Sequence, residues 1–123
     1  MLLDNNKLTE FPRGVFENVT LRTLNLAYNL LHTIAPKALS AITLHSLTLY
    51  SNKLEEIDPE AFDIQELMLL SLDVNLVKLL RPGDLRNLPE LEELSLQKNE
   101  LKEIPEGVFN NTKLIEFGRQ QDR

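Results

Sequence analysis

The chain has 123 residues, of which 42% are hydrophobic and 26% charged, a composition expected of one globular domain. Its net charge is −6, so it lacks the basic surface with which proteins bind nucleic acid, and no nucleic-acid partner is expected. No apolar run approaches the roughly 20 residues that a membrane-spanning helix needs, so no membrane insertion of this segment is expected.

One pattern recurs along the chain in steps of 23, 23, 23 and 24 residues, and an asparagine marks each copy. A leucine lies three residues before each asparagine, and apolar residues lie two, five and ten residues after it. Self-similarity at this period predicts a solenoid of stacked units, because one such unit cannot bury its apolar side alone. The marking asparagines are Asn6, Asn29, Asn52, Asn75 and Asn99.

Each copy contains an alternating Leu-x-Leu stretch, which predicts a short strand with both leucines on one face. In chain order these strands are expected at 1–3, 24–26, 47–49, 70–72 and 94–96. Proline, glycine and aspartate after the strands predict an irregular return segment. The chain therefore forms a single domain, 1–123, with five repeats at 1–20, 21–43, 44–66, 67–90 and 91–113 and a partial sixth at 114–123.

Each copy reads Leu-x-x-Leu-x-Leu-x-x-Asn-x-Leu, and the phrase Pro-x-Gly-x-Phe occurs at Pro12–Phe16 and Pro105–Phe109. The chain resembles leucine-rich repeat proteins. Its repeat length resembles the animal extracellular type, as in Toll-like receptor, lymphocyte receptor and insect immune ectodomains, although their cysteine-rich caps are missing. The resemblance implies an α/β-type leucine-rich repeat solenoid, a right-handed superhelix with short parallel strands on the concave face and turns or 3-10 segments on the convex face. It also implies that the five asparagines form a ladder of hydrogen bonds to the backbone of their own and the neighbouring repeat.

Outward strand positions of the second to fourth repeats combine tyrosine and aliphatic side chains, including Met68, with small polar groups. Tyrosine anchors among small polar groups are typical of protein interfaces, although scattered apolar residues are also normal on surfaces. We therefore expect a protein ligand on the concave face. The predicted ligand-binding residues are Asn25, Tyr28, Thr48, Tyr50, Leu69, Ser71, Asp73 and Val74.

The sequence predicts no enzyme, cofactor or metal site. Its two histidines, His32 and His45, are expected on different faces, so they cannot share a metal ion or complete a catalytic triad. No glycine-rich phosphate loop is present.

The resemblance implies an extracellular receptor or immune-type recognition protein. Sequons at Asn18 and Asn110 predict glycosylation if the chain is secreted. The absence of cysteine and of a signal peptide favours an alternative, a cytoplasmic adaptor or scaffold. A further alternative is a structural part of a longer arc that binds nothing by itself. The uncapped ends also predict self-association.

Overall fold

The computed structural model describes residues 1–14, 16, 19–109 and 116–119. Within these ranges the chain forms short β-strands and no helix. The strands are β1 (Glu10–Phe11), β2 (Val19–Thr20), β3 (Thr23–Asn25), β4 (Thr33–Ile34), β5 (Ile42–Thr43), β6 (Ser46–Thr48), β7 (Leu69–Ser71), β8 (Glu93–Leu96) and β9 (Glu116–Arg119).

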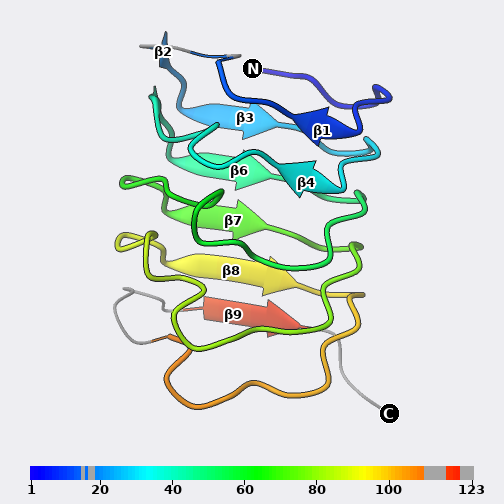
Figure 1. Ribbon diagram of the computed structural model, residues 1–123, viewed down its shortest axis with the longest axis vertical. Helices are drawn as coiled ribbons and strands as arrows, with labels where there is room; N and C mark the ends of the chain where they lie inside the picture. Colours follow the sequence, from blue (N-terminus) through cyan, green and yellow to red (C-terminus); the bar gives the residue numbers. More distant parts are fainter. Residues whose placement is uncertain (15, 17–18, 110–115, 120–123) are drawn as a thin grey trace.

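One strand from each of five successive repeats joins a parallel sheet in the order β3-β6-β7-β8-β9, stacked one beneath another in Figure 1. The register pairs Thr23 with Ser46, Ser46 with Leu69 and Leu69 with Glu93. Each residue therefore pairs with the residue at the equivalent position of the next repeat. An isolated parallel bridge from Leu2 to Asn25 continues the sheet into the first repeat. The expected leucine-rich solenoid of parallel strands is therefore confirmed.

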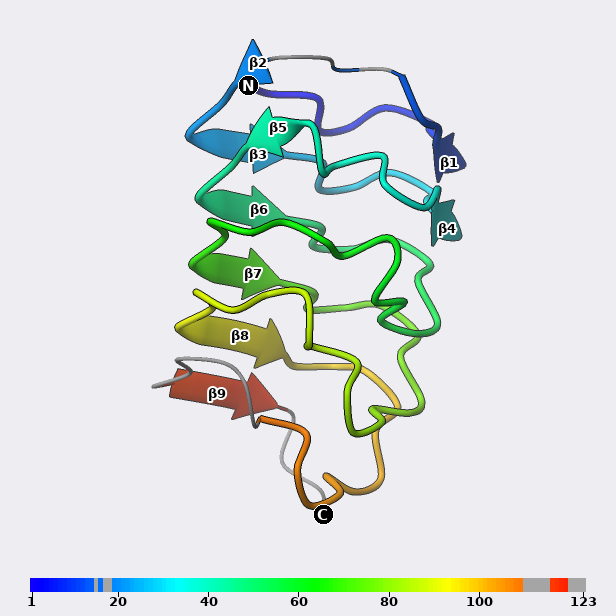
Figure 2. The ribbon, with the colours of Figure 1, turned by 60° about the vertical axis from the view of Figure 1, so that its left-hand side comes forward.

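The core lies between this sheet and the return segments, which occupy the opposite side of each coil (Figure 2). Both leucines of each strand point inward because strand side chains alternate between the two faces. In the second repeat these are Leu24 and Leu26, which have no exposed surface. Equivalent leucines of the neighbouring repeats join them in one buried aliphatic cluster.

The return segments consist of turns and two short parallel strand pairs, with no 3-10 helix in the described ranges. β1 pairs with β4, and β2 pairs with β5. Both pairs join the first repeat to the second, so these two repeats are connected on the return side as well as through the main sheet.

Asparagine side chains connect consecutive repeats where each strand ends. The Asn75 amide donates to the carbonyl oxygens of Leu72 in its own repeat (3.0 Å) and Leu49 in the preceding one (2.9 Å). Its Oδ1 accepts the N–H of Leu54 at 3.0 Å. One buried amide thus satisfies three backbone groups that would otherwise lack partners. The equivalent three contacts occur at Asn29 and Asn52.

The residue before each of these asparagines has a left-handed backbone conformation. The φ angles lie between 58° and 61° at all five positions. The N–H of this residue donates to the next repeat, for example from Val74 to the Gln97 carbonyl at 2.8 Å. Asparagine tolerates this conformation, whereas a β-branched residue is strained in it. The five residues are Asn5, Tyr28, Ser51, Val74 and Lys98.

We predict that Asn75→Ala will destabilise the chain far more than Asn6→Ala. Without the Asn75 amide, buried backbone groups lose their hydrogen-bond partner, and each unpaired group costs about 1–3 kcal/mol. The total loss of stability should therefore reach about 3 kcal/mol or more. Asn6 is exposed, and within the described residues its side chain bonds carbonyls of its own repeat alone, at Leu3 and Asp4. Urea unfolding of both variants measures the difference. Equal losses would show that the contacts between repeats do not set the cost.

A second prediction concerns the strain at Val74. Val74→Asn should raise the free energy of unfolding by about 1 kcal/mol, because asparagine adopts the left-handed conformation more readily than valine. Val74→Thr is the matched control, since it adds a polar group but keeps the branched Cβ. Thermal melts should rank the asparagine variant above both wild type and the threonine variant. A threonine variant as stable as the asparagine one would contradict the explanation.

Candidate functional site

The outward side of the main sheet, here called the strand face, carries exposed large hydrophobic side chains in the second to fourth repeats. Tyr28 is 51% exposed, Met68 41%, Leu69 39% and Tyr50 37%. They come from three consecutive repeats, so the solenoid brings them to one surface. Outward side chains do not contribute to the buried cluster, so the fold does not require large hydrophobic residues at these positions.

The two tyrosines form an aromatic pair across adjacent repeats. Their ring centroids are 5.4 Å apart and the rings are tilted by 58°, a geometry favourable to aromatic pairs. The backbone fixes their separation, since the Tyr28 N–H donates to the Tyr50 carbonyl at 2.8 Å. Partial desolvation and the neighbouring Tyr50 raise the pKa of Tyr28. The protonated form of the Tyr28 phenol is thus favoured further, and a protonated phenol can donate a hydrogen bond.

Several polar residues predicted to bind ligand already accept hydrogen bonds from groups of the chain itself. The Asn25 side chain accepts the Ala27 N–H at 2.9 Å, and Thr48 accepts the Tyr50 N–H at 3.4 Å. Asp73 Oδ1 accepts both the Ser95 hydroxyl at 2.5 Å and the Gln97 N–H at 2.7 Å. These side chains shape the strand ends, a role that the sequence did not reveal. Half-buried Ser71 and Val74 complete the eight predicted residues, all of which lie on the strand face and none of which is buried.

Two hollows flank the aliphatic pair of Met68 and Leu69. One, of about 150 Å³, lies on the strand face between β7 and β8 and includes Leu69, Ser71 and Glu93 in its lining. The other, of about 400 Å³, lies where the chain enters the strands and includes His45, Glu66 and Met68. The aliphatic pair thus stands between two concave regions, where a protruding ligand group would gain contact on several sides.

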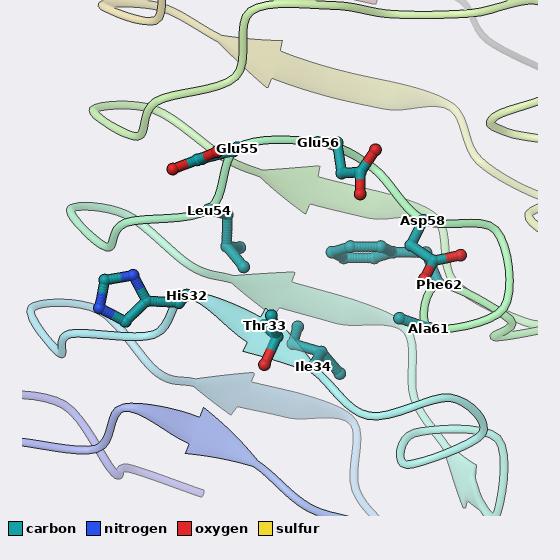
Figure 3. A pocket seen from close by; sticks show the side chains of 9 residues that line it. All are labelled: His32, Thr33, Ile34, Leu54, Glu55, Glu56, Asp58, Ala61 and Phe62. Atoms are coloured by element: carbon teal, nitrogen blue, oxygen red, sulfur yellow. The ribbon is translucent and has the colours of Figure 1, made fainter.

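A third cavity, of about 260 Å³, opens on the return side between the second and third repeats (Figure 3). It lies where strand pairing stops. Backbone hydrogen bonds join Lys53 to Leu31 (2.8 Å) and Lys37 to Glu60 (2.9 Å) at its two ends, with none between them among the described residues. At equivalent positions of the preceding seam, β1 pairs with β4. The lining residues are His32, Thr33, Ile34, Leu54, Glu55, Glu56, Asp58, Ala61 and Phe62.

The acidic groups of this cavity are partly occupied by contacts within the chain. Arg81 pairs with Glu56 at 2.7 Å, and Asp58 Oδ1 accepts the Glu60 N–H at 3.0 Å. His32 and Asp58 lie at opposite ends of the cavity in Figure 3, with apolar side chains between them. Their separation gives them no common point at which to act on a substrate. Across the described part of the chain, no group of His, Asp and Glu is arranged to hold a metal ion.

A family model for the leucine-rich repeat matches residues 1–44 and 42–101. The chain belongs to the leucine-rich repeat family. Leucine-rich repeats generally serve as modules that bind other proteins, and they are not generally enzymes. No curated protein matches the chain significantly.

Two features expected from the sequence bear on where this leucine-rich repeat chain acts. The sequon asparagines Asn18 and Asn110 lie outside the described residues. The described ranges contain no helix with the length and apolar character needed to cross a membrane.

An ion pair joins the second and third repeats on the return side. Lys37 Nζ lies 2.9 Å from Asp63 Oδ2, and the Gln65 amide donates to the other carboxylate oxygen at 2.9 Å. The lysine hydrogen bond is the main reason that the pKa of Asp63 lies below its usual value, since the Gln65 amide acts more weakly in the same direction. The charged carboxylate is thus favoured in the folded state.

We predict that Lys37→Gln will destabilise the chain near neutral pH and that its deficit relative to wild type will vanish in acid. A depressed carboxylate pKa contributes stability above the unfolded value, and this contribution is lost as the pH falls through the folded value. Thermal melts from about pH 7 to about pH 2 measure the deficit. Lys53→Gln, at a lysine without an ion pair in the described ranges, is the matched control. A deficit independent of pH would rule out Asp63 as its source.

Proposed function

We propose that the chain is a protein-binding module that holds its ligand on the concave strand face. The observation that carries this proposal is the exposure of Met68 and Leu69 on the same face of the sheet as the Tyr28–Tyr50 pair. Exposed apolar surface bordered by polar groups is typical of interaction sites. Aromatic and methionine side chains are enriched at the centres of protein interfaces.

The neighbours of Leu69 strengthen this proposal. Its register partners are Ser46 on β6 and Glu93 on β8, both polar. A polar residue would therefore be compatible with this strand position, and leucine is not needed to build the sheet. A binding role accounts for leucine here, since burial against a ligand would remove its apolar surface from water.

For the biological setting we propose an extracellular receptor or immune-type recognition protein. The resemblance of the repeat to the animal extracellular type and the sequons at Asn18 and Asn110 support this setting. A cytoplasmic adaptor is the alternative, supported by the absence of cysteine. Mass spectrometry of glycopeptides from native protein distinguishes the two, because an N-glycan on either asparagine requires passage through the secretory pathway.

Self-association is a second candidate role, favoured by the first repeat. Leu2 is 75% exposed and Met1 49%, while Leu3 and Leu8 are only partly buried against the core. An apolar strand edge of this kind can pair with another chain. Light scattering over a range of protein concentrations tests this role, and a monomeric mass throughout would exclude it.

The strand-face proposal predicts that Leu69→Ser and Tyr50→Ala will each weaken ligand binding by about thirtyfold or more, as expected of interface anchors. The chain is first immobilised to capture and identify a partner from its native source. The affinity of the purified partner is then measured for each variant by calorimetry.

Leu79→Ser is the matched control for this measurement. Leu79 is 50% exposed, so it resembles Leu69 in exposure, but it lies on the return segment rather than the strand face. Its affinity should equal that of wild type. A partner that is indifferent to Leu69 and Tyr50, with all variants folded by circular dichroism, would place binding elsewhere on the molecule.

A further inference from the structure

Two acidic residues lie one strand away from the exposed aliphatic pair. Leu69 on β7 is the register partner of Glu93 on β8. The N–H groups of Glu92 and Glu93 both donate to the Met68 carbonyl, at 2.8 and 3.1 Å. Adjacent strands are about 4.8 Å apart, so two carboxylates stand beside Met68 and Leu69 within the reach of one ligand segment.

The opposite side of the pair has a different charge. The N–H groups of Met68 and Leu69 both donate to the His45 carbonyl, and the His45 N–H donates to the Arg22 carbonyl. Arginine, histidine, methionine and glutamate therefore follow one another at equivalent positions of four successive repeats. The surface changes from basic to apolar to acidic along the solenoid.

Within the described residues, no ion pair neutralises the acidic end of this gradient. The ion pairs of the described residues involve Lys37, Arg81 and Arg86, and none includes Glu66, Glu92 or Glu93. The backbone register continues from Glu93 to Glu116 on β9. Glu92 and Glu93 carry like charges at consecutive positions, so both would attract a bound cation.

We infer that the ligand is a cationic protein segment with at least one large apolar side chain. The apolar side chain packs against Met68 and Leu69, while lysine or arginine side chains pair with Glu92 and Glu93. Arg22 fixes the direction, because it repels the same cations at the other end of the gradient. This inference rests on the proposed function and adds the chemical class of the partner and its orientation.

A synthetic peptide of twelve residues with alternating leucine and lysine serves as the probe, and fluorescence anisotropy measures its affinity. The double variant Glu92→Gln with Glu93→Gln should bind about tenfold more weakly than wild type. Glu55→Gln with Glu103→Gln is the matched control, since it removes the same charge from exposed return-side residues without ion pairs in the described ranges. Its affinity should change by less than about twofold.

Three further outcomes sharpen the test. Added salt should weaken the probe more for wild type than for the Glu92 and Glu93 double variant, because screened carboxylates contribute less. Leu69→Ser should also weaken binding, and a probe with glutamate in place of lysine should not bind. Equal losses in both double variants, or full affinity in Leu69→Ser, would overturn the inference by showing general charge attraction only.

Failure of this inference is distinguishable from failure of the proposed function. A captured partner that needs Leu69 and Tyr50 but tolerates loss of Glu92 and Glu93 leaves the strand face as the binding site and removes the cationic partner. A partner that tolerates loss of Leu69 and Tyr50 removes the strand face itself. Thermal melts of every variant confirm that the repeats remain folded.

Discussion

The asparagine amide is the contact on which the solenoid depends. At Asn75 a single side chain ties the end of its own strand to two backbone groups of the preceding repeat. The asparagine amide offers two N–H donors and a carbonyl acceptor on one short rigid plane. The asparagine also fixes the neighbouring geometry, because the residue before it turns left-handed and links forward to the next repeat. Backward and forward contacts therefore meet at one corner of the second, third and fourth coils.

Because these contacts lie at the corners and in the core of the coils, outward residues of the strand face can vary without loss of the fold. The asparagine ladder and the inward leucines hold the coils together, and neither requires a particular outward side chain. Outward positions such as 50 and 69 are consequently available for recognition without loss of the core. Some outward polar residues remain tied to the fold, since Asn25 and Asp73 bond backbone N–H groups. The strand face thus combines exposed apolar side chains, which the fold does not require, with polar side chains that stabilise the backbone.

Sequence periodicity predicts the features that depend on local alternation. Leu24 is inward and Tyr50 outward because a strand has a period of two, and the 23-residue step aligns them with their neighbours. Features set by backbone trajectory could not be predicted. Val74 occupies a left-handed position that its own preference opposes, so no propensity points to it. The return-side cavity forms because backbone hydrogen bonds between two coils stop after Leu31. The sequence gives no sign of this, since the Ile-x-Pro phrases at 34–36 and 57–59 in the two coils are alike.

That cavity also bears on how the solenoid can bend. Each coil contacts only its neighbours, so stiffness is a property of each seam separately. Two strand pairs clamp the return side of the first and second repeats, but between the second and third the clamp is reduced to its ends. Fewer backbone hydrogen bonds therefore hold the return side of this seam than that of the preceding one. Tyr28 belongs to one coil and Tyr50 to the other, and the Tyr28 N–H joins the coils on the strand side by its 2.8 Å hydrogen bond to the Tyr50 carbonyl. The second and third repeats are therefore joined more continuously on the strand side than on the return side, and the aromatic pair lies on the more continuously joined side.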